Sequence, residues 1–305
     1  MGFLGPIGTF TEQALLTQPD LARSELSPLP SMPDVLFATA AGDVNFGFVA
    51  IENSIEGTVN VTLDTLAFEV DLFIQREVVI TVQMNLLGLP GTRLDQVREV
   101  VSIPHATAQC RSFLSRALPN VGTRATNSTA EAAKAVADEA DPGLVAIAPS
   151  MTAALYGLEV LASDVEDHPE NATRFVLVHP RLVPPPTGHD KTTLVIFQDA
   201  DRPGSLLSIL QEFAARAINL TKLESRPTKR GLGHYCFIVD LEGHVADEVV
   251  ADCLRNLKAK QADVKFLGSY PAAGESGPAV RREAEAAWKA ADQWLTTLRS
   301  RVEQR

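Results

Sequence analysis

Polar side chains follow two of the expected strands, at positions where a ligand would be held. The segment AIENSIEGTV, residues 50–59, begins as an apolar strand and then presents Asn53 among two glutamates and a serine. The segment VVSIPHATAQCRSFL, residues 100–114, ends a second strand at Ser102 and places Gln109 seven positions further on, so a helix over that stretch would put both on one face. Because ligands of open α/β sheets bind outside the carboxyl ends of strands, these residues predict a small-molecule site. The alternative is a turn whose side chains bond their own backbone.

A third polar turn, NATRF at residues 171–175, directly precedes another expected strand. The hydroxyl of Thr173 can donate or accept a hydrogen bond, and the guanidinium of Arg174 can hold a carboxylate through two hydrogen bonds. The alternative is a polar turn with a solvated arginine. Asn171 begins an N-glycosylation pattern, but that interpretation needs secretion, for which the sequence gives no support. His105 is a candidate general base, although a histidine near a helix start more often makes only a structural hydrogen bond.

Two expected helix starts could attract an anion. Thr9 and Glu12, within GPIGTFTEQAL at residues 5–15, have the spacing of a capping box, and so do Ser128 and Glu131. Exposed backbone N–H groups at such a start favour a ligand carboxylate. Each box also explains its own residues without a ligand, so the two interpretations are compatible. The first segment is not a dinucleotide fingerprint, because it lacks a third glycine at the required spacing.

Composition excludes several classes of protein. The 305 residues are 45% hydrophobic, which is typical of a globular chain and not of a disordered one. A net charge of -11 argues against a general nucleic-acid binder. No apolar run reaches the ~20 residues of a membrane span, and the start of the chain has no signal-peptide pattern. The three cysteines show no CxxC or metal-ligand spacing, so we expect buried thiols in a reducing cytoplasm, with no metal or cofactor.

The expected elements divide the chain into two folded parts and a tail. Before residue 180, short apolar runs alternate with helical patterns, including helices at 105–118 and 129–140, which predicts α/β architecture. RLVPPPTGHD, residues 181–190, is expected to be an extended linker. The order after it is βαββαβ, which predicts a ferredoxin-like module. Within residues 272–305, apolar side chains at helical spacing predict a tail helix packed on the body or on another subunit: Ala284, Trp288, Ala291, Leu295 and Leu298.

Five of the segments described above resemble the prephenate dehydratase family, in the family's order and over nearly the whole chain. They are the segments around Thr9, Asn53, Ser102, Ser128 and Thr173, and the TRF turn is the most distinctive. Members of that family are lyases that convert prephenate to phenylpyruvate on the route to L-phenylalanine. The resemblance implies a catalytic domain over residues 1–180, with two lobes like those of periplasmic binding proteins and the second lobe at about 77–159. It implies Thr173 as the catalytic residue. It also implies a substrate site that contains Asn53, Ser102, Gln109, Glu131, Arg174 and Thr9.

Residues 191–271 resemble an ACT domain, the regulatory ferredoxin-like module of amino-acid metabolism. GSLL at residues 204–207 is similar to the family's GALV motif, and ESRP at residues 224–227 matches the family's motif as it stands. The resemblance implies an L-phenylalanine site at an interface between ACT domains, and therefore a homodimer or homotetramer. The effector residues carried over are Gly204, Ser205, Leu206, Leu207, Asn219, Glu224, Ser225, Arg226 and Pro227.

Other functions fit part of these observations. Arogenate dehydratase shares the motifs and takes the amino-acid form of the substrate. A ligand-binding regulator would use the two lobes as a receptor, but it has no need for the threonine of the TRF turn. A scaffold that binds partners through the tail helix would be expected to show a heptad run, which is missing. The sequence does not identify the proton donor, for which Glu56 and Glu131 are candidates.

Overall fold

The computed structural model describes residues 1–198, 202–229, 231, 234–261, 263–273 and 290–301. Contacts divide the chain into two compact units. The first comprises Met1–Thr65 and Val78–Val178, and the second comprises Leu66–Glu77 and His179–Arg305. No helix within the described residues is both long and apolar enough to cross a membrane.

One sheet of the first unit has the strand order β2-β1-β3-β11-β5, with β4 paired to β3. Strand β3 pairs in parallel with β1 and antiparallel with β11. The strands are β1 (Gly2–Leu4), β2 (Ser27–Leu29), β3 (Gly47–Asn53), β4 (Gly57–Thr58), β5 (Phe73–Thr81) and β11 (Ala172–His179). The accompanying helices are α1 (Phe10–Leu16), α2 (Met32–Ala41) and α3 (Asn60–Phe68). The sequence prediction missed α2, α3 and the short strands β2 and β4.

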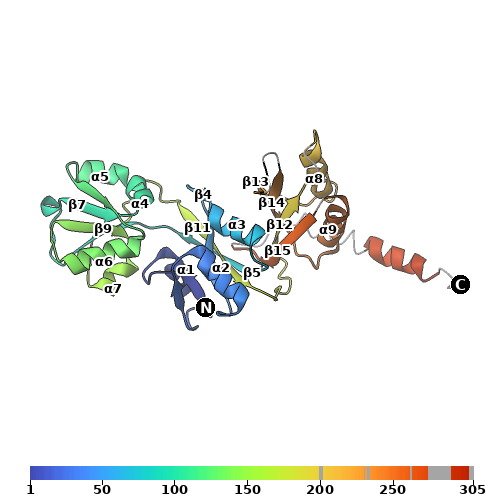
Figure 1. The fold of residues 1–305 in the computed structure, drawn as a ribbon, viewed down its shortest axis with the longest axis horizontal. Helices are drawn as coiled ribbons and strands as arrows, with labels where there is room; N and C mark the ends of the chain where they lie inside the picture. Colours follow the sequence, from blue (N-terminus) through green and yellow to red (C-terminus); the bar gives the residue numbers. More distant parts are fainter. Residues whose placement is uncertain (199–201, 230, 232–233, 262, 274–289, 302–305) are drawn as a thin grey trace. The chain divides into compact units, whose positions relative to one another are not determined.

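A second sheet in this unit has the order β10-β6-β9-β7-β8. Its strands are β6 (Asn85–Gly88), β7 (Glu99–Ser102), β8 (Gly122–Ala125), β9 (Leu144–Ala148) and β10 (Glu159–Ala162). All of β9 is buried, and its side chains alternate between two cores: Val145 and Ile147 pack with α4 and α5, while Ala146 and Ala148 pack with α6 and α7. Helices therefore cover both faces of the sheet (Figure 1): α4 (Pro104–Gln109), α5 (Arg111–Ala117), α6 (Thr129–Glu139) and α7 (Met151–Tyr156).

The single helix expected over residues 105–118 is two helices. The backbone of Cys110, with φ −112° and ψ 16°, lies between α4 and α5. Ser102 is the last residue of β7, so it does not share a helical face with Gln109. The helix begins only at Pro104, whose fixed φ suits the first helical position.

The second unit has the expected βαββαβ order. Its elements are β12 (Asp190–Phe197), α8 (Ser205–Ala214), β13 (Leu220–Pro227), β14 (Tyr235–Glu242), α9 (Glu248–Lys260) and β15 (Asp263–Pro271). The antiparallel sheet has the order β13-β14-β12-β15, and its apolar core includes Ile209 and Phe213 from α8 and Leu257 from α9. Both helices lie on the same side of the sheet (Figure 1).

A stretch from earlier in the chain completes this unit. The ring centroids of Phe73 and Phe266 lie 5.9 Å apart, and Lys191 Nζ lies 2.9 Å from the Glu77 carboxylate. Gly268, at φ +139°, approaches β5 so closely that a Cβ there would lie 2.6 Å from the carbonyl oxygen of Ile74. The segment from Leu66 to Glu77 is therefore packed into the second unit by direct contacts.

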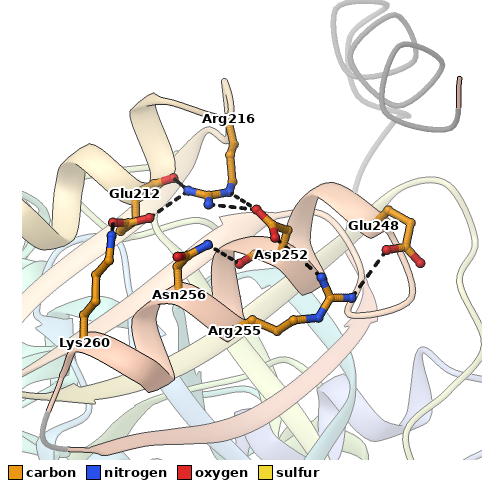
Figure 2. Close-up of polar contacts among 7 residues, drawn as sticks. All are labelled: Glu212, Arg216, Glu248, Asp252, Arg255, Asn256 and Lys260. Carbon is orange, nitrogen blue, oxygen red and sulfur yellow. Dashed lines mark hydrogen bonds and ion pairs between the residues drawn. The ribbon is translucent and has the colours of Figure 1, made fainter. Parts of the chain in front are cut away.

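Charged side chains cross-link the two helices of the second unit (Figure 2). Arg216, just after α8, donates to the Glu212 carboxylate at 2.8 Å and to the Asp252 carboxylate on α9 at 2.8 Å. Lys260 Nζ donates to the other oxygen of Glu212 at 2.5 Å. The Arg216 side chain is only 12% exposed, so these ion pairs are shielded from water more than ordinary surface pairs are.

The tail contains a helix over residues 290–299, and its described side chains are exposed. Trp294 is 65% exposed. Ala284 and Trp288 lie outside the described residues. Packing of this helix on another subunit stays a prediction.

Candidate active site

The centre of the candidate site is a pair of residues on adjacent strands. The register of β3 and β11 places Asn53 opposite Thr173. Asn53 Nδ2 donates to Thr173 Oγ1 at 2.9 Å and to Asn171 Oδ1 at 2.9 Å. Asn53 Oδ1 accepts the backbone N–H groups of Ile55 and Glu56, each at 2.9 Å. The turn after β3 therefore holds the Asn53 amide rigidly against Thr173.

Asn171 connects this pair to α4, one of the helices that cover the second sheet. Its Nδ2 donates to Gln109 Oε1 at 3.1 Å. Gln109 Nε2 donates to Glu56 Oε1 at 3.1 Å, and His105 Nδ1 lies 3.3 Å from the other carboxylate oxygen of Glu56. Three predicted site residues, Asn53, Gln109 and Thr173, are thus joined in one hydrogen-bond network.

The sequence analysis did not assign Asn171 to the site, although it belongs to the polar segment NATRF and begins a glycosylation pattern. It is 1% exposed, and it precedes Thr173 by two positions. Side chains two apart along an extended chain lie on the same face. That alternation is the signal that could have placed Asn171 beside Thr173.

Arg174 has a partner within the chain. Its Nη1 lies 3.2 Å from a Glu52 carboxylate oxygen, and its side chain is only 10% exposed. Phe175 is buried and stacks on Phe48 with ring centroids 5.4 Å apart. Thr173, Arg174 and Phe175 were expected in a turn before the strand, but they lie within β11 itself. Arg174 and Phe175 therefore anchor β11 against β3, and the threonine presents the hydroxyl.

The hydrogen bond that Ser102 makes is outside this network. Its hydroxyl donates to the Ile147 carbonyl at 2.7 Å, and the residue is 1% exposed. The bond ties the end of β7 to β9, which is the strand beside it in the sheet. The observed role of this hydroxyl is to hold the strand from which α4 departs.

Both predicted helix caps form, and each already holds a carboxylate of the chain. Thr9 Oγ1 accepts the N–H of Glu12 at 3.4 Å, and the Glu12 carboxylate accepts the N–H of Gly8 at 2.5 Å. In the same way Ser128 caps Glu131, whose carboxylate accepts the N–H of Asn127 at 2.9 Å.

The two helix starts are close together. Gly8 has φ +91°, and a Cβ there would lie 3.4 Å from the Cβ of Ala130. A substrate carboxylate at these starts would therefore lie near the like charges of Glu12 and Glu131, which weakens the attraction that free N–H groups would offer.

The thiol beside Gln109 is not a nucleophile. Burial, with a smaller contribution from the nearby carboxylates of Glu166 and Asp167, raises the pKa of Cys110 to about 12. At neutral pH the thiol is protonated, whereas the reactive species is the thiolate.

In the second unit, all four predicted GSLL residues and one residue of the ESRP motif line a cavity of about 460 Å³. Gly204, Ser205, Leu206, Leu207 and Ser225 line it, together with Arg202, Tyr235 and Phe237. Such a volume lies within the range of small-molecule sites.

The rest of the predicted effector set lies outside this cavity lining. Side chains of β13 alternate, so Glu224 and Arg226 lie on the face opposite Ser225, where their charged atoms are 3.6 Å apart. Asn219 is exposed, and its backbone carbonyl accepts the N–H of Glu242 at 3.0 Å. Pro227 is the exposed last residue of β13.

Comparisons with known proteins agree along the whole chain. The family model of prephenate dehydratase matches residues 1–181, and that of the ACT domain matches residues 192–259. A prephenate dehydratase of Mycolicibacterium vanbaalenii is 42% identical over 98% of this chain and 98% of its own.

Two solved structures are similar to the chain. Prephenate dehydratase of Arthrobacter aurescens, solved in complex with L-Phe, is 39% identical, covers 98% of this chain and 99% of its own, and has a TM-score of 0.90. A protein described as GqqA, a novel type of quorum quenching acylase, is 30% identical, covers 89% of this chain and 97% of its own, and has a TM-score of 0.79. The expected fold, a two-lobed α/β catalytic part followed by a ferredoxin-like ACT domain, is confirmed. The chain belongs to the prephenate dehydratase family of lyases.

Proposed function

We propose that this protein carries out the reaction of its family, the conversion of prephenate to phenylpyruvate, with Thr173 as the residue that contacts the departing hydroxyl. The observation that carries the proposal is the hydrogen bond from Asn53 Nδ2 to Thr173 Oγ1, at 2.9 Å, which holds the threonine in one place. Fixing a reacting group in advance lowers the entropic part of the barrier.

The chemistry needs few protein groups. The bond from the ring to its carboxylate breaks, and carbon dioxide leaves. The electron pair completes the aromatic ring and displaces the hydroxyl, which takes up one proton and departs as water. A hydrogen bond from Thr173 stabilises the charge that develops on that oxygen. Asn53 and Gln109 hold the threonine and its surroundings in position, and a site closed to water favours loss of the carboxylate charge.

The test is phenylpyruvate formation by Thr173→Val, which keeps the shape of the side chain and removes the hydroxyl. We expect kcat to fall about 100-fold or more, the range for loss of one hydrogen-bond donor to an oxygen on which charge develops. Thr173→Ser, which keeps the hydroxyl, is the matched control and should retain most activity. Turnover by the valine variant within threefold of wild type, with an unchanged melting temperature, would rule out this role. Arogenate is the second substrate to assay, because the shared motifs leave the preference between the two open.

We further propose that L-phenylalanine binds in the cavity lined by Ser225 and residues 204–207. The rim includes Leu207 and Tyr235, which are 58% and 43% exposed. Apolar side chains exposed at the edge of a cavity suit a second copy of the chain as cover, which supports a homodimer or homotetramer formed through the ACT domains.

Ser225→Leu should weaken L-phenylalanine binding at least tenfold in titration calorimetry, because the larger side chain occupies the cavity. Ser208→Leu is the matched control, since Ser208 is exposed on α8 outside the cavity lining. Equal affinity in both variants would place the effector elsewhere. Light scattering with and without the effector measures the oligomer. A cytoplasmic location agrees with the three buried free cysteines.

A further inference from the structure

We infer that Asn171 and Glu56 are positioning residues that fix the direction of the hydrogen bonds ending at Thr173, so that the threonine hydroxyl donates a hydrogen bond to the substrate. This inference deepens the proposed function and rests on it. Thr173 alone could either donate or accept. The side chains around it decide which of the two it does.

The first fixed point is the Glu56 carboxylate. A carboxylate can only accept hydrogen bonds, so Gln109 must turn its Nε2 toward it, and the two atoms are 3.1 Å apart. The oxygen of the Gln109 amide then faces Asn171, which must donate through Nδ2, at 3.1 Å. Asn171 Oδ1 is thereby directed to the other side, where it accepts from Asn53 Nδ2 at 2.9 Å and from Ser54 Oγ at 3.3 Å.

The second fixed point is the backbone of the turn after β3. The N–H groups of Ile55 and Glu56 can only donate, and both bond to Asn53 Oδ1. Asn53 must therefore present Nδ2 to Asn171 and to Thr173. The two ends impose the same direction on the amides between them, so no amide in the series can reverse without leaving two donors or two acceptors face to face.

The consequence falls on the threonine hydroxyl. Its oxygen accepts from Asn53, and within the described part of the chain it donates no hydrogen bond of its own. That proton is available to a ligand oxygen. Asn171 is central to the arrangement, because it is 1% exposed and bonds to both Asn53 and Gln109. Its replacement would leave polar groups of the partly buried Asn53 or Gln109 without a partner, which is costly.

The experiment is a cycle of carboxylate and amide exchanges at two positions. Asn171→Asp removes the donor toward Gln109 while keeping the acceptor toward Asn53. Gln109 then lies between two carboxylates and can donate to only one of them. Glu56→Gln in the same chain lets Gln109 turn over. It can then donate to the new carboxylate at position 171 and accept from the new amide at position 56, so that every hydrogen bond has a partner again.

We expect N171D to lower kcat for prephenate roughly 10- to 100-fold, the equivalent of one unpaired buried group, with a smaller change in KM. The kcat of N171D/E56Q should be at least fivefold higher than that of N171D. The matched control is N171D/E170Q, because Glu170 is the adjacent residue, its side chain is 77% exposed, and its neutralisation takes away the same charge without touching Gln109.

Recovery in N171D/E56Q but not in N171D/E170Q supports the inference. Equal recovery in both would reduce the effect to net charge and overturn it, and so would an N171D enzyme with kcat within twofold of wild type. Melting temperatures of these three variants and of the wild type give a readout that is independent of turnover. Restoration of the melting temperature by E56Q without recovery of kcat would make the network structural only. Failure of the wild-type chain to consume prephenate would instead overturn the proposed function, while the coupling in melting temperature would still test the network.

Discussion

At the scale of single residues, the site depends on which polar side chains bond to the backbone and which bond to one another. Thr9, Ser102 and Ser128 each have a hydroxyl that bonds to the backbone nearby. The hydroxyl of Thr173 differs because it bonds to a side chain of the site, the amide of Asn53. Of these four hydroxyls, it is the one that neither a helix cap nor a backbone carbonyl engages.

This distinction explains which features of the site could be predicted from the sequence. Residue types and spacing identified Asn53, Gln109 and Thr173 as polar groups near strand ends and helix starts, and the fold joins them in one network. Spacing does not reveal which backbone carbonyl lies beside a hydroxyl, so it did not place Ser102 against Ile147. Nor did it pair Arg174 with Glu52, because register between strands far apart in sequence is decided by the packing of the whole sheet.

The buried thiols give a prediction at this scale. Burial raises the pKa of Cys110 and of Cys253 to about 12. At pH 8 only about one thiol in 10⁴ at each position is ionised, so labelling by a thiol reagent should be slow and should accelerate about tenfold per pH unit. Mass spectrometry of the labelled peptides assigns the rates. Labelling of Cys110 in the native protein as fast as in guanidinium would contradict the prediction.

At the scale of elements, ion pairs as well as the apolar core hold the two helices of the ACT domain together. The Glu212 carboxylate on α8 accepts from Lys260 on α9 and from Arg216, and Arg216 also reaches Asp252 (Figure 2). Because the start of α8 lines the proposed effector cavity, these pairs fix the helix that an effector would contact.

The pH dependence of this contact follows from Glu212. The hydrogen bond from Lys260 lowers the pKa of Glu212 from its ordinary value, burial opposes this shift, and Arg216 adds to it. A lowered pKa in the folded state stabilises the protein above the unfolded value near 4.5, and that contribution is lost as the pH falls through the folded pKa. Glu212→Gln should therefore lower the melting temperature at pH 7, and the difference from wild type should shrink as the pH falls below about 4.

Glu248→Gln is the control for that experiment. Glu248 lies on α9, 3.5 Å from Arg255, and its side chain is 49% exposed, so its pair contributes little. An equal loss of melting temperature in both variants would show that the Glu212 contact carries no special weight.

Element boundaries were less predictable than element types. The βαββαβ order was legible because each of its elements is eight residues or longer. The strands β2, β4, β8 and β10 have two to four residues, too few for a periodic pattern. The division of one expected helix into α4 and α5 at Cys110 leaves no mark in the apolar spacing, which runs through both.

At the scale of the whole molecule, the two compact units do not divide at the proline-rich linker alone. The segment Leu66–Glu77 belongs by its contacts to the second unit, although sequence order places it inside the catalytic half. The expectation of a boundary at residues 181–190 came from composition. Composition does not reveal contacts between residues far apart in sequence, such as the hydrogen bond from Lys265 Nζ to the carbonyl of Val70 at 2.7 Å.

The close approach at Gly268 tests this assignment. Gly268→Ala should lower the free energy of unfolding by more than Gly42→Ala, although both glycines have positive φ. A Cβ at position 268 meets backbone atoms of Ile74, whereas a Cβ at position 42 meets nothing within 4 Å. The Gly42 variant measures the cost of placing an alanine in the left-handed region without a steric contact, about 1–2 kcal/mol. Equal losses in urea unfolding would mean that the chain relaxes away from the contact.

The strand β5 gives this arrangement a consequence for exchanging regulatory modules between enzymes. Its first five residues, 73–77, belong to the second unit, and its last four, 78–81, belong to the first. A chimaera joined in the linker would pair a foreign ACT domain with a segment shaped for this one. Crossover points near residues 65 and 77, together with one in the linker, would transplant the module with the partner surface it needs. The second unit is thus made from two stretches of sequence that are separated by about a hundred residues of the first unit, and an exchange that moves only one of them breaks contacts that the other needs.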